Sequence, residues 1–197
     1  MLIIFYGTSC VGKTTLMRYL RDNYGWKIIS TYMTRERRKG ESEKKTVPKE
    51  ELEEGAQNGR FLPLNECYGN YYGTPIDELK HAVEAVDEYW CLDFLIEKKD
   101  VLDNFPHCSI VIQPESIDQL KYQIFKANRM ERQNEILFEN KNYYSDAMVG
   151  HFDKVTNHTD DLKRTCEEIL KIAQRYKKLI GEKNECIIEY RYKKRIG

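Results

Sequence analysis

Hydrophobic residues change their spacing several times along the chain, and each spacing predicts a different kind of element. Residues 2–6 form a short, continuously apolar run that stops at Gly7, as is typical of a buried strand in a parallel sheet. From Lys13 to about Asn23, apolar residues recur at helical spacing with charged residues between them. Gly25 predicts the end of that helix. The chain is therefore expected to begin as strand, loop and helix.

The same analysis divides the rest of the chain into further elements. In order, it predicts a strand at 26–30, a charged loop at 31–49, a helix at 48–57, a strand at 61–64, an aromatic turn at 68–73, a helix at 75–86, strands at 89–93 and 108–112, two helices around a polar turn within 121–142, a strand at 152–156 and an amphipathic helix at 160–178. The tail at 185–195 alternates only in part and predicts either an edge strand or a frayed end. Strands that alternate with helices indicate an α/β fold with a mostly parallel sheet.

Composition limits the kinds of partner. The chain of 197 residues has 32 basic and 32 acidic residues, so no global charge attracts nucleic acid or an anionic membrane, and we expect neither as a partner. Its length fits a single domain spanning residues 1–197. The N-terminus has no basic leader, no apolar run approaches a membrane span, and the six cysteines are scattered, so we expect a cytoplasmic protein with reduced thiols. The oligomeric state is left open.

The segment that follows the first strand carries the strongest chemical signal. It fits the pattern GxxxxGK[ST] between a predicted strand and a predicted helix, which is the context that a phosphate-binding loop requires. In such a loop the backbone N–H groups face phosphate oxygens, Lys13 reaches the β and γ phosphates, and the Thr14 hydroxyl can bind Mg²⁺. The sequence therefore predicts an ATP or GTP site with Mg²⁺, made of Gly7, Thr8, Ser9, Cys10, Val11, Gly12, Lys13, Thr14 and Thr15.

A cysteine inside this loop suggests a chemical probe. We hypothesise that alkylation of Cys10 blocks nucleotide binding; the alternative is a small filler residue that points away from the phosphates.

A second group of cations follows the second predicted strand, in the segment 34–41 with the sequence TRERRKGE. Planar guanidinium groups suit bidentate capture of a phosphate. The phosphate loop, this T-R-x-x-R-x-G-E segment and the GNYYGT segment at 69–74 occur in the order seen in guanylate kinases, and the chain resembles that family weakly from Leu2 to about Tyr176. The resemblance implies a three-layer P-loop kinase sandwich with an acceptor-binding region at about 31–75 and a lid at about 124–142.

The resemblance also implies roles for single residues. On the acceptor side, it implies that the phosphate is held by Arg35, Arg38 and Tyr72 and that the base is contacted by Thr31 and Thr74. It implies that Asp93 positions hydrated Mg²⁺ or orients the acceptor phosphate, and that Asn157 lies near the adenine of ATP. Candidates for the lid arginines that neutralise the transferring phosphoryl group are Arg129 and Arg132. From the residues alone, Thr74 is equally a helix N-cap before Pro75 and Asp77, Thr31 a plain strand residue, and Asp93 a structural carboxylate.

Three features depart from the family. Pro63 and Leu95 stand where guanylate kinases carry the two carboxylates that accept hydrogen bonds from guanine, and neither side chain can do so. The loop after Glu41 is shorter and lacks a phosphate-binding tyrosine, for which Lys44 or Lys45 could compensate. The lid offers few arginines. These departures leave the acceptor open.

Three functions compete at this stage. The first is an ATP-dependent kinase of a nucleoside monophosphate, either GMP or a related nucleotide. The second is a sugar-phosphate kinase that resembles ribose 1,5-bisphosphate kinase, favoured by Pro63 and Leu95. The third is a catalytically dead binding module, which the intact Gly12, Lys13 and Thr14 disfavour.

Overall fold

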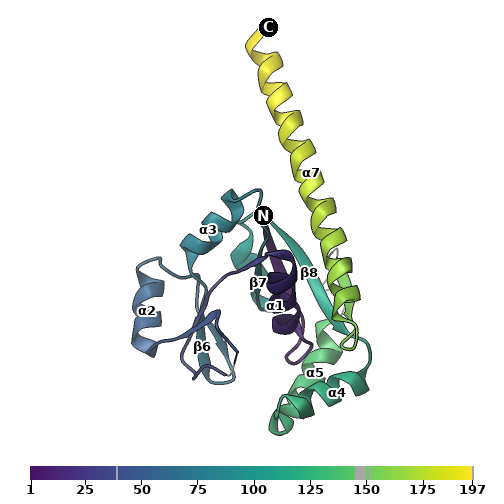
Figure 1. The fold of residues 1–197 in the computed structure, drawn as a ribbon. Coiled ribbons are helices and arrows are strands. Elements are labelled where there is room, and N and C mark those ends of the chain that lie inside the picture. The colour runs from purple at the N-terminus through teal and green to yellow at the C-terminus, as the bar shows by residue number, and fades with distance from the viewer. Residues whose placement is uncertain (39, 145–149, 151, 197) are drawn as a thin grey trace.

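A five-stranded parallel sheet forms the centre of the protein (Figure 1). The computed structural model describes residues 1–38, 40–144, 150 and 152–196, with the side chains of 142 and 181–196 outside that description. The strands lie in the order β2 (Lys27–Ile28), β7 (Trp90–Asp93), β1 (Leu2–Tyr6), β8 (His107–Pro114) and β9 (Asp153–Asn157), and every neighbouring pair is parallel. The prediction of an α/β fold around a parallel sheet is confirmed.

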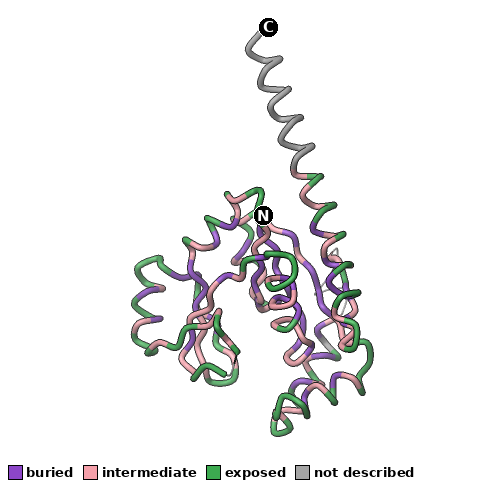
Figure 2. The backbone as a smooth tube through the Cα atoms, in the orientation of Figure 1, coloured by how far each residue is buried: buried purple, intermediate pink, exposed green. Residues whose placement is uncertain are grey.

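Alternate residues of β1 point to opposite sides of the sheet, and helices cover both faces. Ile3 and Phe5 pack with α1 (Lys13–Tyr24) and with the first turns of α7 (Leu162–Ile196). Leu2, Ile4 and Tyr6 pack on the other face with α3 (Ile76–Glu84) and with the 3-10 helix η1 (Ile96–Leu102). All five residues of β1 are buried, and the strands at the centre of the molecule are largely purple, the colour of buried residues, in Figure 2.

Three further helices lie beside the carboxyl ends of β8 and β9: α4 (Ile117–Lys126), the short 3-10 helix η2 (Met130–Arg132) and α5 (Gln133–Tyr143). The Ser116 side chain accepts a hydrogen bond from Gln119 N and so caps α4 at its N-terminus. This part of the chain confirms the prediction of two helices around a polar turn.

A smaller sheet stands to one side of the central sheet, together with α2 (Lys49–Gln57) (Figure 1). Its strands lie in the order β4 (Lys44–Thr46), β3 (Thr31–Met33), β6 (Asn70–Gly73) and β5 (Asn65–Cys67). The prediction of a loop over 31–49 was therefore incomplete, because β3 and β4 lie within it. These strands are short and bury only Met33, so they leave no hydrophobic period in the sequence.

Two predictions near β5 differ from the structure. The predicted strand at 61–64 is absent: Phe61 makes only an isolated bridge to Pro75, Pro63 has no N–H to donate, and pairing begins at Asn65. The predicted aromatic turn at 68–73 is a hairpin, with Tyr68 and Gly69 at positive φ in the turn and β6 after it. The sheet therefore brings β6 between β3 and β5.

The ends of two helices also differ from expectation. Pro75, not Thr74, is the N-cap residue of α3, and no side chain caps this helix. The Thr74 side chain is free for another role because it does not cap. The last helix continues to Ile196, so the edge-strand alternative for the tail is wrong.

Candidate active site

An open cleft of about 850 Å³ lies at the carboxyl ends of β1 and β7 and reaches across to the smaller sheet. Ligands of open α/β sheets bind at this edge. Every residue predicted above for the phosphate loop, the acceptor site and the lid lines the cleft except Val11, which is buried with only 2% of its surface exposed, and Lys45, one of the two lysines considered as a substitute. The fold thus gathers residues from 7–15, 31–38, 72–74, 93, 129–132 and 157 around one space.

The phosphate loop needs its glycines because of close backbone contacts and positive φ angles. Gly12 has φ +101°, and a Cβ atom there would lie 2.4 Å from Asn157 Nδ2. Gly7 has φ +147°, and a Cβ atom there would lie 2.6 Å from the Ile112 carbonyl oxygen. Any larger residue would strain the loop and force these neighbours apart.

Lys13 begins α1 and turns its ammonium group back over the loop. Its Nζ donates to the carbonyl oxygens of Gly7 and of Thr8, the latter at 3.0 Å, and lies 3.6 Å from Asp93 Oδ1. Asp93 is the last residue of β7, so the carboxylate stands at the sheet edge beside the loop. A fixed cation and the N-terminus of α1 make this a site for phosphate groups.

Two tyrosines that sequence reasoning missed support the loop from below. The Tyr143 hydroxyl accepts a hydrogen bond from Gly7 N at 2.9 Å. The Tyr144 hydroxyl donates to Ile112 O at 2.8 Å and lies 3.5 Å from Thr8 Oγ1 in the loop. Burial raises the pKa of both phenols, so both stay protonated near neutral pH. Only the adjacency of two tyrosines at the end of a helix would have hinted at this role.

Asn157, at the end of β9, also contacts the loop. It is 1% exposed, and its Nδ2 donates to Val11 O at 2.8 Å. The side chain therefore fixes the loop backbone directly. A contact with adenine, implied by the resemblance, stays a prediction.

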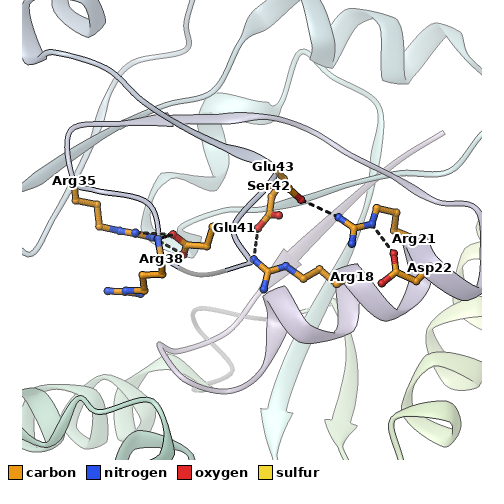
Figure 3. Close-up of polar contacts among 8 residues, drawn as sticks. All are labelled: Arg18, Arg21, Asp22, Arg35, Arg38, Glu41, Ser42 and Glu43. Carbon is orange, nitrogen blue, oxygen red and sulfur yellow. Dashed lines mark hydrogen bonds and ion pairs between the residues drawn. The ribbon is translucent and has the colours of Figure 1, made fainter.

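The acceptor side of the cleft is organised by a carboxylate. Arg35 Nη1 and Nη2 donate to the two oxygens of Glu41, each at 2.7 Å, and Glu41 also accepts from Arg38 N at 2.9 Å (Figure 3). The hydrogen bonds to Glu41 raise the pKa of Arg35, with a smaller contribution from the Tyr72 hydroxyl beside it. Burial alone would raise the pKa of Glu41, but Arg35 and the nearby cations outweigh burial and hold it below its usual value.

The same loop is tied to α1 by a second carboxylate. Arg18 Nη2 donates to Glu43 Oε1 at 2.7 Å, and the Glu43 side chain is only 5% exposed (Figure 3). One turn further along α1, Arg21 Nη1 donates to Ser42 Oγ at 3.3 Å. The helix that begins at the phosphate loop therefore also anchors the loop that carries Arg35, Glu41 and Glu43, called the acceptor loop below.

Comparison with known proteins decides the family. The model of the guanylate kinase family, described as "Guanylate kinase", matches residues 1–176. The chain belongs to the guanylate kinase family. It is therefore identified as an ATP-dependent phosphotransferase.

Relatives and a solved structure agree with this assignment. The chain is 32% identical over 183 residues to the guanylate kinase of Prochlorococcus marinus subsp. pastoris, covering 88% of this chain and 96% of the relative. It is 29% identical over 194 residues to that of Mycoplasmopsis pulmonis, covering 91% and 96%. The fold is similar to the crystal structure of guanylate kinase from Anaplasma phagocytophilum, with a TM-score of 0.66, 22% identity and coverage of 90% and 86%.

In this guanylate kinase-family chain, two arginines reach the cleft from the predicted lid. Arg129 Nη1 lies 3.7 Å from the Cys10 sulfur in the phosphate loop. The Arg132 guanidinium stacks on the ring of Tyr68, whose hydroxyl donates to Glu139 in α5. Arg129 thus lies beside the phosphate loop and Arg132 beside the β5–β6 hairpin, where an aromatic ring that sequence reasoning missed holds Arg132.

The departures from the family are visible at the far end of the cleft. Leu95 lines it, whereas Pro63 is exposed and does not. Thr31 and Thr74 line the same end, and Thr74 is buried. Of the two lysines considered as substitutes for the missing tyrosine, Lys44 lines the cleft and Lys45 is exposed and donates to the Tyr32 hydroxyl. The cation available on this side is therefore Lys44.

Across residues 1–38, 40–144, 150 and 152–180, no group of three or more His, Cys, Asp or Glu side chains could hold a metal ion alone. Likewise, no helix in the described part of the chain is long and apolar enough to cross a membrane.

Proposed function

We propose that this protein transfers the γ-phosphoryl group of Mg·ATP to GMP or a related nucleoside monophosphate. The observation that carries the proposal is one cleft lined at one end by the phosphate loop with Lys13, and at the other by Arg35, Arg38 and Tyr72. A cleft with two phosphate-binding ends suits a reaction between two phosphates. Membership of the guanylate kinase family supports GMP as the acceptor.

On the donor side, Lys13 neutralises the β and γ phosphates of ATP while the loop N–H groups hold them. Tyr143 and Asn157 act behind the loop by fixing its backbone through Gly7 N and Val11 O. A preorganised loop spends no free energy on rearrangement when charge develops during transfer.

A magnesium ion fits the same end of the cleft. The Thr14 hydroxyl and the Asp93 carboxylate both line it, and Mg²⁺ prefers oxygen ligands shared with phosphates and water. When bound, the ion neutralises phosphate charge and orients the phosphoryl group. Thr14 would ligate the ion directly, and Asp93 would orient its water ligands.

On the acceptor side, Arg35 is presented in a fixed orientation because Glu41 holds both of its terminal nitrogens. Arg38 and Tyr72 complete the phosphate-binding group, and Thr31 and Thr74 lie where the base would enter. Arg129 and Arg132 would stabilise the phosphoryl group as it moves in line from donor to acceptor without a covalent enzyme intermediate. Residues 31–75 then act as the acceptor-binding region and 124–142 as the lid of one domain.

The test is a coupled assay of ADP release with Mg·ATP against GMP, dGMP, the other monophosphates and ribose 1,5-bisphosphate. We expect turnover on GMP, reduced by at least about 100-fold in Lys13→Ala. Lys27→Ala, which changes an exposed lysine of β2, is the matched control and should leave the rate unchanged. Turnover on ribose 1,5-bisphosphate alone would replace the nucleotide acceptor with a sugar phosphate. No turnover on any acceptor, with or without Lys13, would favour a binding module.

A cytoplasmic location is part of this proposal. It is supported by the five cysteines whose side chains the structure describes, Cys10, Cys67, Cys91, Cys108 and Cys166, all of which are free thiols.

A further inference from the structure

One buried polar side chain in the cleft has no role in the reaction described above. Asn65, the first residue of β5, lines the cleft but is only 7% exposed. Its Oδ1 is buried and has no hydrogen-bond partner among the described residues. Leaving a buried carbonyl oxygen without a hydrogen-bond donor is unfavourable, so such a group in a binding cleft points to a ligand that supplies the missing donor.

The position of Asn65 relative to the phosphate-binding group is fixed by strand pairing. Asn65 is the direct partner of Tyr72 in the antiparallel pair of β5 and β6. Directly opposite residues project from the same face of a sheet with Cβ atoms about 5 Å apart. Asn65 therefore lies beside the residue proposed to bind the acceptor phosphate, within reach of the group attached to that phosphate.

A neighbouring cation adds chemical direction. Lys98, which also lines the cleft, donates through Nζ to the carbonyl oxygen of Leu64 at 2.8 Å, next to Asn65 in the chain. An ammonium group at this place favours a ligand that presents a carbonyl oxygen rather than an amino group. The amide of Asn65 offers one acceptor and one donor side by side.

We infer that Asn65 reads the lactam edge of the acceptor base, meaning a ring N–H next to a ring C=O. Oδ1 accepts from the ring N–H and Nδ2 donates to the ring carbonyl. Guanine and hypoxanthine carry this edge, whereas adenine carries an amino group next to an unprotonated nitrogen. Asn65 is thus a specificity-determining residue for 6-oxopurine monophosphates, an inference that rests on the proposed nucleotide kinase function.

The inference predicts a change in preference rather than a general loss of activity. With Mg·ATP fixed, kcat/KM would be measured for GMP, IMP and AMP. In Asn65→Leu, which has similar volume and no hydrogen-bonding group, GMP and IMP should each lose about 100-fold and AMP less than about threefold. In Asn65→Asp, the carboxylate repels the ring carbonyl but accepts from both N–H groups of guanine, so the GMP to IMP ratio should rise about tenfold.

The matched control is Asn104→Asp, an exposed asparagine before β8 at the other end of the strands, which should leave all three values unchanged. A structural role for Asn65 would lower the melting temperature and all three kcat/KM values together, and that outcome would overturn the inference. If the unmodified protein uses GMP and the ratios of kcat/KM among GMP, IMP and AMP are unchanged in both Asn65 variants, this inference would be overturned while the proposed function would stand. Lack of turnover on any nucleotide by the unmodified protein would overturn the proposed function as well.

Discussion

The two ends of the cleft are held in place in different ways. The phosphate loop is fixed through its own backbone: Tyr143 accepts from Gly7 N, Asn157 donates to Val11 O, and glycines allow the close contacts. The acceptor end stands on short, mostly polar strands and is held by side-chain ion pairs, between Arg35 and Glu41 and between Arg18 of α1 and Glu43. A rigid donor site suits one invariant ligand. Residues that form side-chain ion pairs can be substituted without changing the backbone, so the acceptor end can be adapted to different acceptors.

The sharpest test of this difference removes the acceptor cation. Arg35→Ala should lower kcat/KM for the acceptor by about 100-fold, because charge-assisted hydrogen bonds to the phosphate are worth about 1.5–3 kcal/mol. The affinity for ATP should stay within about twofold, since Arg35 belongs to the other end. Steady-state kinetics with each substrate varied in turn would measure both, with the exposed Arg37→Ala as control. A similar loss for ATP would mean that the two ends are not separate.

The next test weakens the support of the same cation. Glu41→Gln should lower the free energy of unfolding by about 2 kcal/mol at neutral pH, because it removes a charge-assisted pair with Arg35. Since the folded-state pKa of Glu41 is lowered, the pair stabilises the fold above the usual glutamate pKa of about 4.3 and loses this contribution as the pH falls through the lower folded value.

Denaturant titrations of the unmodified protein and the variant at pH about 7 and about 3 would measure this dependence. The difference between them should shrink at the lower pH, and the exposed Glu54→Gln should show no difference at either. A constant difference across that range would contradict an electrostatic role for Glu41.

A smaller effect is expected when the donor end loses one neutral hydrogen bond. Tyr143→Phe leaves the buried Gly7 N–H without its acceptor, which should weaken ATP binding by about tenfold and leave acceptor binding unchanged. Calorimetric titration with ATP would measure the loss. Tyr122→Phe, at a residue 59% exposed on α4, provides the matched control. Equal weakening of acceptor binding would contradict a purely local support.

The mildest test uses the thiol of the phosphate loop. Burial raises the pKa of Cys10, opposed in part by Arg129, so iodoacetamide should react with it more slowly at pH 7 than with a free cysteine, and the rate should rise about tenfold per pH unit below the raised value. ATP should protect Cys10, and GMP alone should not. Mass spectrometry in a Cys67→Ser background would follow the reaction, because Cys67 also lines the cleft. Full activity after complete modification would reject the hypothesis that alkylation of Cys10 blocks nucleotide binding.

The donor end could be predicted from the sequence more fully than the acceptor end. The strand Leu2–Tyr6, the helix from Lys13 and its end at Gly25 are confirmed, because one contiguous segment carries the apolar run, the glycines and the cation. Tyr143, Glu41 and Asn65 were missed as site residues, since each gains its role from a partner that only the tertiary fold brings near. The strand predicted at 61–64 was wrong because an apolar run gives no register, and Pro63 moved the pairing to Asn65.

For protein engineering, the contacts of α1 matter because this one helix connects the two ends of the cleft. Lys13 and Thr14 at the start of this helix face the donor, while Arg18 and Arg21 further along hold Glu43 and Ser42 of the acceptor loop. A chimera that exchanged residues 31–75 for the corresponding region of another kinase would have to carry matching partners for these two arginines. Otherwise Arg18 would be left without its carboxylate at the graft junction, and the transplanted region would lose its alignment with the phosphate loop.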